Sequence, residues 1–276
     1  MTRSRDEPGT GSPLVFIVVA CALVAFVVSA VLGERPGNSG PLPLGLAGSV
    51  PPTAAPVEDP PALPAGGLTV SHPRLEGHRP ATPVGPQFYV PGNAVALTFD
   101  DGPDPRWTPR VLDLLRANHV HATFCLIGQS ARAHPALVRR IVAEGNALCD
   151  HTWDHDERMP AAPVAHVEQE IQTAAEAIAT ASGGVSPRYF RAPGGNWSPV
   201  ELAQAGAIGM RPLAWSVDPR DWSRPGTTHI LRAVLSARPG DVILCHDGGG
   251  DRSQTVAALA RALPILRGRG LSFVLP

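Results

Sequence analysis

The sequence predicts a parallel α/β protein whose sheet closes into a deformed (β/α) barrel of about seven strands. Seven apolar runs alternate with helical patterns after residue 90, and strands that alternate with helices form parallel sheets. A closed sheet in this size range is a (β/α) barrel, with its active site at the carboxyl ends of the strands. An open Rossmann sheet is the alternative, although no G-x-G-x-x-G follows the first run.

The expected elements follow one another along the chain with recognisable helix starts. Proline in a first helical turn marks three of those starts, at Thr108-Pro109, His134-Pro135 and Ser198-Pro199. Glycine marks three expected helix ends, at Gly145, Gly183 and Gly206. The expected strands lie at 94–100, 121–127, 147–151, 188–191, 211–217, 241–245 and 271–275.

The first 90 residues are expected to precede the folded domain. The uncharged run 14–32 spans about 28 Å as a helix, enough to cross a bilayer as a signal anchor. Arg3 and Arg5 keep residues 1–13 cytoplasmic, which places the domain at 91–276 outside the cell membrane. Cleavage after Ala30 is the alternative and would release a secreted protein. Residues 33–90 are rich in Pro, Gly and Ala and predict a disordered linker.

Composition excludes several classes of function. The net charge is −1 and the basic residues are scattered, so nucleic acid is not an expected partner. The chain contains no lysine, which rules out a P-loop lysine and a Schiff-base lysine. The chemistry must therefore come from Asp, Glu, His, Arg, Cys or a metal.

Ionisable residues gather where the expected strands end. Because parallel strands end at one edge of the sheet, these side chains are expected to meet there. Any one of them alone could be structural, but their shared position favours a functional site. They are Asp100 and Asp101, His151, Arg191, Asp218 and His246.

A metal explains the adjacent carboxylates of Asp100 and Asp101. Two like charges this close oppose each other's ionisation, which a cation relieves. The segment "HTWDH" adds His151 and His155, and with Asp101 they form a set of two imidazoles and one carboxylate. Three protein ligands that leave a position for water suit Zn²⁺. Asp100 then remains free beside that water.

Five ordered motifs, "TFDDGP", "HTWDH", "FRAPGG", "SVDPRDW" and "ILCHD", resemble those of the polysaccharide deacetylase family, the NodB-homology domains or family 4 carbohydrate esterases. The resemblance covers about residues 93–276. It implies a deformed (β/α) barrel that uses a divalent metal, usually zinc and alternatively Co²⁺, to remove N-acetyl and sometimes O-acetyl groups from glycans.

The resemblance also implies roles for individual residues. Asp101, His151 and His155 would be metal ligands, and Asp100 would be the general base, oriented by Arg191. Asp218 would pair with His246, the general acid.

The substrate side of the site follows from the same motifs. Trp222 and Leu244 would line the acetyl pocket, with Pro193 and Gly194 beside the substrate. The chain departs from the family at Gly194-Gly195, where an aromatic residue is common, so a pocket wall is expected to be missing. The backbone N–H there could still serve the oxyanion.

The four cysteines bear on compartment and on chemistry. Cys125 and Cys149 lie near the ends of consecutive expected strands, so a disulfide between them is expected in an oxidising space. Cys245 next to His246 allows a Cys/His nucleophile, but the ordered Asp and His set explains more of the sequence.

Three hypotheses on function remain open. The first is a metal-dependent deacetylase of N-acetylglucosamine glycans, with peptidoglycan favoured by the tether and chitooligosaccharides or acetylxylan as alternatives. The second is a glycan-binding protein without turnover, and the third is a membrane-anchored scaffold. The presence of both a base, Asp100, and an acid, His246, favours the first. The oligomeric state is not predicted.

Overall fold

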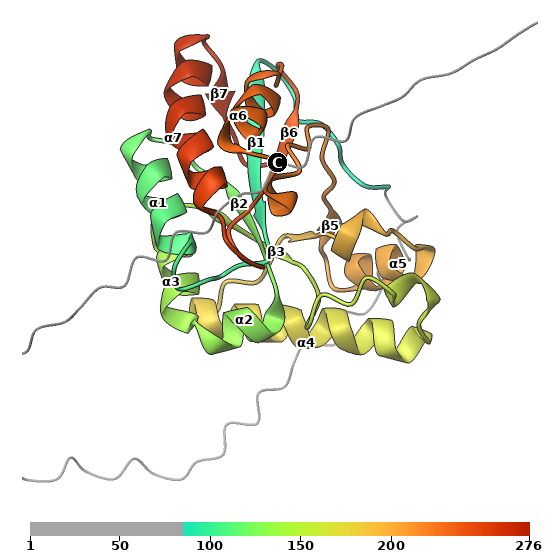
Figure 1. Ribbon diagram of the computed structural model, residues 1–276. Coiled ribbons are helices and arrows are strands. Elements are labelled where there is room, and N and C mark those ends of the chain that lie inside the picture. The colour runs from blue at the N-terminus through green and yellow to red at the C-terminus, as the bar shows by residue number, and fades with distance from the viewer. Residues whose placement is uncertain (1–84) are drawn as a thin grey trace, which may run out of the picture. The chain divides into compact units, whose positions relative to one another are not determined.

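A curled parallel sheet lies at the centre of the computed structural model, which describes residues 85–276 (Figure 1). The strands lie in the order β5-β4-β3-β2-β1-β6, and β7 pairs with the first residues of β1. All of these pairings are parallel. The strands are β1 Ala94–Asp100, β2 Thr123–Leu126, β3 Ala147–Asp150, β4 Tyr189–Phe190, β5 Arg211–Pro212, β6 Val242–His246 and β7 Ser272–Phe273.

Helices alternate with the strands and cover the sheet. Helix α4 runs beside α2 and α3, and α6 packs against α7 (Figure 1). The α-helices are α1 Thr108–Ala117, α2 Gly128–Ala133, α3 Pro135–Ala143, α4 Val164–Ser182, α5 Pro199–Ala207, α6 Thr227–Leu235 and α7 Ser253–Gly268. Three short 3₁₀ helices lie in the loops: η1 Met159–Ala161, η2 Pro193–Gly195 and η3 Asp221–Ser223.

Strand β1 has the predicted bounds and is buried along its whole length. It pairs with β2 on one edge and β6 on the other, and its complete burial shows that both faces are covered too. A nearly continuous apolar run is what a central parallel strand requires. Its last residue, Asp100, pairs in register with Cys125 of β2 and with His246 of β6.

The predicted strand 211–217 is shorter than expected, because only Arg211–Pro212 pairs with β4. The carbonyl groups of Leu213 and Ala214 accept hydrogen bonds from the Arg191 guanidinium, so they are not free to continue the ladder. The chain then turns toward the other edge of the sheet, where Val217 forms an isolated parallel bridge with Ile243 of β6. This return path agrees with the predicted deformed barrel rather than with an open Rossmann sheet.

The predicted helix starts are confirmed and one helix end is corrected. Proline stands in the first turn of α1, α3 and α5, and Ser198 caps α5 through reciprocal hydrogen bonds with Glu201. Gly183 ends α4 in the left-handed conformation, with φ 84°. Gly206 lies inside α5, and the left-handed turn after that helix falls at Gly209 instead.

The core and the disulfide hold the central strands together. The largest apolar cluster joins β1, β2 and β6 to the inner faces of α1, α3, α6 and α7. The predicted disulfide between Cys125 and Cys149 is present and links register partners of β2 and β3.

The folded part begins slightly before residue 91. Gln87 forms an isolated parallel β-bridge with Leu213, and the Val90 N–H donates to the Gly240 carbonyl. Gln87 and Val90 thus belong to the folded domain and not to the linker predicted at 33–90. The predicted anchor 14–32 and nearly all of the linker lie outside the described residues. Among the helices of residues 85–276, none has both the length and the apolar character needed to cross a membrane.

Candidate active site

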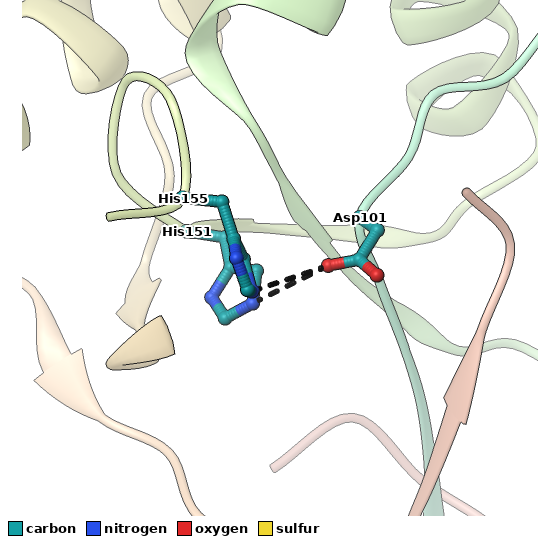
Figure 2. A group of neighbouring side chains, drawn as sticks. All are labelled: Asp101, His151 and His155. Atoms are coloured by element: carbon teal, nitrogen blue, oxygen red, sulfur yellow. Dashed lines mark ion pairs between the residues drawn. The ribbon is translucent and has the colours of Figure 1, made fainter. Parts of the chain in front are cut away.

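Asp101, His151 and His155 converge at the carboxyl edge of the sheet (Figure 2). The Nε2 atoms of His151 and His155 lie 3.7 Å and 3.5 Å from the same Asp101 oxygen, Oδ1. Asp101 follows β1, His151 follows β3, and the loop after β3 folds back with His155 at φ 65°. The structure thus brings together the three predicted metal ligands, which are called the ligand group below.

The unpaired oxygen of Asp101 fits a cation at this point. Its Oδ1 is buried and has no hydrogen-bond partner among the described residues, although it faces both imidazoles. A buried carboxylate oxygen without a donor is costly unless something satisfies it. Two imidazole nitrogens and one carboxylate oxygen are a donor set that suits Zn²⁺ and leaves a coordination position open. The residues present therefore fit a divalent metal.

His151 is held in the form that binds a metal. Its Nδ1 lies 2.7 Å from the Arg191 backbone carbonyl oxygen, which can only accept, so Nδ1 carries the hydrogen. Nε2 then carries a lone pair on the side of Asp101 Oδ1, where a metal would bind. Burial lowers the pKa of His151 to about 3, so the ring is neutral at physiological pH.

Asp100 is paired with a fully buried arginine. The Arg191 Nη1 lies 2.6 Å from Asp100 Oδ1 and also donates to the Thr98 hydroxyl at 2.9 Å. The remaining oxygen, Oδ2, lies 3.7 Å from His151 Nε2. Arg191 therefore fixes one carboxylate oxygen of Asp100 and leaves the other beside the candidate metal ligands, which is the position that the predicted base needs.

His246, the last residue of β6, is paired with Asp221. Its Nδ1 lies 2.7 Å from Asp221 Oδ1, and its backbone N–H donates to Asp221 Oδ2 at 3.0 Å. The Thr255 hydroxyl donates to that second oxygen at 2.7 Å. Burial opposes the charged form of His246, but the hydrogen bond and charge of Asp221 outweigh it and raise the pKa to about 9. His246 is thus a cation at neutral pH.

The predicted pairing of Asp218 with His246 is wrong. Asp218 is exposed, and its Oδ1 accepts from the backbone N–H of Arg220 at 2.7 Å. That bond turns its carboxylate toward its own loop, and the chain carries Asp221 into the position under His246 instead. Asp218 still lines the pocket described next.

A pocket of about 430 Å³ opens over these groups. Trp222 and Leu244 line it, as predicted, with Leu244 buried and Trp222 half exposed. Gly194 also lines it, whereas Pro193 is buried and does not line the pocket. The substrate-binding position predicted for Pro193 is therefore not supported by this geometry.

Trp215 supplies the aromatic wall that Gly194-Gly195 was expected to lack. A Cβ on Gly195 would lie 2.8 Å from the Trp215 ring, so the glycine makes room for that ring. The ring centroid also lies 5.4 Å from the Arg191 guanidinium carbon. The wall is thus built by a residue distant in sequence, rather than being absent.

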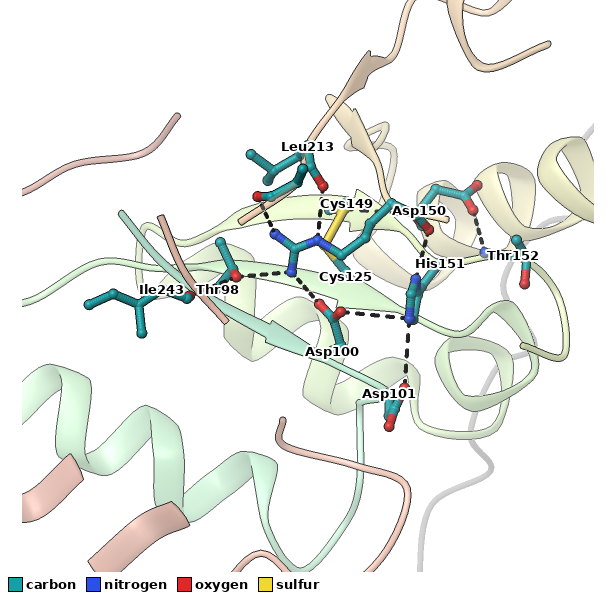
Figure 3. The surroundings of a disulfide bond; sticks show 12 residues. Thr98, Asp100, Asp101, Cys125, Cys149, Asp150, His151, Thr152, Leu213 and Ile243 are labelled. Carbon is teal, nitrogen blue, oxygen red and sulfur yellow. Dashed lines mark hydrogen bonds and ion pairs between the residues drawn. A yellow bond between two sulfur atoms is a disulfide. The ribbon is translucent and has the colours of Figure 1, made fainter. Parts of the chain in front are cut away.

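The disulfide lies directly behind the site (Figure 3). Cys125 of β2 is the register partner of Asp100, and Cys149 of β3 lies two residues before His151, so the bond links strands that carry the site (Figure 3). Cys245 is buried as a free thiol, and burial raises its pKa well above the ordinary range. A buried, protonated thiol is inert, which argues against the Cys/His nucleophile.

Sequence reasoning missed Asp221, Trp215 and Arg252. Asp221 had a usable signal, since it begins the turn before Trp222 and stands in the same motif as Asp218. Trp215 and Arg252 also line the pocket. Neither lies at the end of a strand, and the sequence motifs assigned a role to neither. No pattern in the sequence alone marks those two.

Comparison with known proteins gives consistent matches over the described region. A family model described as polysaccharide deacetylase matches residues 89–213. A chitooligosaccharide deacetylase from Sinorhizobium fredii is 46% identical over 188 residues, covering 64% of this chain and 87% of that protein. A peptidoglycan-N-acetylglucosamine deacetylase from Bacillus cereus is 41% identical over 197 residues, covering 67% and 88%.

A solved structure is similar in fold. A family 4 carbohydrate esterase from Streptomyces lividans, in complex with acetate, superposes with a TM-score of 0.62 at 36% identity. The match covers 66% of this chain and 92% of that one.

Proposed function

This chain belongs to the polysaccharide deacetylase family, and on that basis we propose that it hydrolyses the N-acetyl groups of N-acetylglucosamine glycans with the help of a bound divalent metal. One observation carries the proposal: a neutral-histidine ligand group and a cationic histidine border the same pocket. Hydrolysis of an amide needs both a base for water and an acid for the leaving amine. A glycan-binding protein or a scaffold needs neither.

The ligand group supplies the electrophilic side of the reaction. Asp101, His151 and His155 would hold the metal, and zinc is the ion that this donor set favours. Bound there, it would polarise the amide carbonyl and lower the pKa of a water. The Arg191 carbonyl keeps His151 in the tautomer that this requires.

The chain's own groups move the protons. Asp100 Oδ2 accepts a proton from the attacking water, while Arg191 fixes Oδ1 and compensates its charge. His246 donates a proton to the departing amine nitrogen, since Asp221 keeps its ring protonated at neutral pH. The backbone N–H of Gly194, at the pocket wall, is a suitable donor for the oxyanion, because the Gly195 N–H is already bonded to the Ala192 carbonyl.

We propose peptidoglycan as the substrate and the outer side of the cell membrane as the location. The predicted anchor and linker support a domain tethered near a cell wall, and the Cys125–Cys149 disulfide supports an oxidising compartment. Chitooligosaccharides are the second candidate, favoured by the 46% identity to the Sinorhizobium enzyme.

Mass spectrometry of treated glycans tests the proposal. The protein loaded with zinc is incubated with peptidoglycan strands and, separately, with chitooligosaccharides, and each product is examined for loss of acetyl groups. We expect loss from peptidoglycan and release of acetate, both abolished by a chelator and restored by Zn²⁺ or Co²⁺. Loss from chitooligosaccharides alone would select the second candidate. Binding of glycan without any loss of acetyl would contradict enzymatic function.

A further inference from the structure

Arg252 is a buried arginine that lines the active-site pocket and has no role in the proton transfers above. It precedes α7, at the end of the glycine-rich loop 247–251 that follows His246. Only 3% of the residue is exposed. Its Nε donates to the Gly248 carbonyl at 2.6 Å, which holds the guanidinium beneath the loop.

The charge of Arg252 has no partner among residues 85–276. Its two terminal nitrogens make no hydrogen bond there, and no carboxylate lies within 4.0 Å of the guanidinium. Buried arginines are normally paired with acids, because an isolated charge loses its hydration. The contrast with Arg191 is clear, since that arginine uses all three nitrogens on fixed acceptors.

The geometry of the loop keeps Arg252 close to the reacting groups. A Cβ on Gly249 would lie 2.5 Å from Asp101 Oδ2, and one on Gly250 would lie 3.6 Å from Arg252 Nη2. The loop therefore approaches the Asp101 carboxylate at Gly249 and the guanidinium at Gly250, the next residue. Both groups border the same pocket.

The other charges of the pocket do not neutralise Arg252. Asp100 is committed to Arg191, and Asp101 to the ligand group. Asp218 and Glu157 are exposed at the rim, where solvent screens them. The guanidinium fork is thus available to an anion that enters the pocket.

The proposed reaction itself makes such an anion. Water adds a C–O bond to the acetyl carbon, the C–N bond breaks, and the amine leaves with a proton from His246. The acetic acid formed gives up its own proton at neutral pH and becomes acetate. A second source of the same chemistry is a carboxylate carried by the glycan, such as the lactyl group of an unsubstituted muramyl sugar.

We propose that Arg252 is a carboxylate-binding residue of this pocket, engaging a carboxylate through its two terminal nitrogens. Planar guanidinium and carboxylate groups match in a bidentate pair, which a lysine could not reproduce. The assignment of a source rests on the deacetylase function proposed above, but the presence of the anion site does not.

Acetate binding to the full chain, stripped of metal by a chelator, tests the site without turnover. Binding of ¹³C-labelled acetate is followed by NMR in wild type, Arg252→Gln and Arg252→Lys, with acetamide as the uncharged analogue. Arg224→Gln is the matched control, because Arg224 is half exposed, pairs with Asp251 and does not line the pocket.

We expect Arg252→Gln to weaken acetate binding by about tenfold or more, as for a lost charge-assisted hydrogen bond, and Arg252→Lys to weaken it less. Acetamide binding and the Arg224→Gln protein should not change. Thermal unfolding of each variant confirms that the glycine-rich loop still folds.

Kinetics on the metal-loaded enzyme identify the source of the carboxylate. If acetate is the ligand, Arg252→Gln raises the inhibition constant of acetate. The ratio of kcat/KM for unsubstituted muramyl strands to that for chitooligosaccharides then stays unchanged. If the glycan carboxylate is the ligand, the variant loses preference for unsubstituted muramyl strands over chitooligosaccharides of equal length. Arg252→Gln behaving as wild type in both arms and in acetate binding would overturn the proposal. Failure of the proposed function would show instead as no deacetylation by wild type, with the acetate titration still deciding the role of Arg252.

Discussion

His151 and His246 border the same pocket in different charge states, one neutral and one cationic. Both rings are buried, and both use Nδ1 in a hydrogen bond of 2.7 Å. The partner of His151 is the neutral carbonyl of Arg191, and burial lowers its pKa to about 3. The partner of His246 is the Asp221 carboxylate, which overcomes burial and raises its pKa to about 9.

The comparison shows that the Nδ1 partner decides what each histidine can do. A carbonyl leaves the ring neutral, with an Nε2 lone pair for a metal. A carboxylate keeps the ring protonated, so that Nε2 can deliver a proton. In the proposed mechanism, one residue type would thus serve both halves of amide hydrolysis.

Removing a ligand on the His151 side should have the largest effect. His155→Ala deletes one of the three proposed metal ligands, so we expect loss of bound metal together with loss of deacetylation. Asp100→Asn should retain the metal and lower kcat by about 10²–10⁴, because only the base is lost. Metal content by mass spectrometry, measured beside activity, separates the two. An empty site in Asp100→Asn would show that the roles of Asp100 and Asp101 are exchanged.

The effect of removing the His246 cation on the rate should depend on the leaving group of the substrate. His246→Ala is expected to lower kcat/KM on an N-acetylated sugar by about 10²–10⁴, the usual contribution of a general acid. An activated ester such as nitrophenyl acetate leaves without a proton, so its hydrolysis should fall much less. The two rates are compared on the same enzyme preparation. Equal losses on both substrates would make His246 a structural residue.

Changing the partner of His246 should convert its behaviour toward that of His151. Asp221→Asn removes the hydrogen-bonded carboxylate that opposes burial most strongly and leaves only the smaller effects of Asp100 and Asp101, so the pKa of His246 should fall. The basic limb of the pH profile should then move below its wild-type position. The activity loss should be smaller than for His246→Ala. Asp218→Asn is the matched control and should leave the basic limb in place, because Asp218 bonds only its own loop. A shift in Asp218→Asn and none in Asp221→Asn would restore the pairing predicted from the sequence.

The smallest expected effect is on stability. Because folding raises the pKa of His246 from 6.5 to about 9, its contribution is complete below pH 6.5 and is lost as the pH rises through about 9. The pKa difference corresponds to about 3 kcal/mol. The free energy of unfolding, measured by urea for metal-free wild type and His246→Gln, should therefore be plotted against pH. The two curves should be apart at pH 6 and approach each other above pH 9. Parallel curves would mean that Asp221 does not hold a proton on His246.

The sequence was sufficient for the central strand and the ligand group, for a physical reason. Strand β1 is a continuous apolar run buried on both faces, and Asp101, His151 and His155 follow strand ends that the hydrophobic pattern locates. Strands β1 and β3 are parallel and separated only by β2, so their carboxyl ends lie at the same edge of the sheet. Local patterns therefore determined this part of the site.

The acid's partner was not predictable in the same way. The strand expected at 211–217 ends early because Arg191 takes the Leu213 and Ala214 carbonyls as acceptors, a contact between distant segments. With no strand end at residue 217, the strand-end rule no longer supports Asp218, and the pairing with His246 that the family resemblance implied for Asp218 is made by Asp221 instead. Asp221 reaches His246 through a turn with left-handed residues at Arg220 and Arg224, which side-chain periodicity does not encode.

The protonation state of the two histidines at neutral pH tests the account most directly. Long-range ¹H–¹⁵N NMR spectra of the metal-free protein, with Asp221→Asn and His151→Ala for assignment, distinguish a ring that carries hydrogens on both nitrogens from one that carries a single hydrogen. We predict that His246 is doubly protonated until the pH approaches about 9, and that His151 is neutral with its hydrogen on Nδ1. A neutral His246 at pH 7, or a cationic His151, would contradict the assignment of acid and ligand.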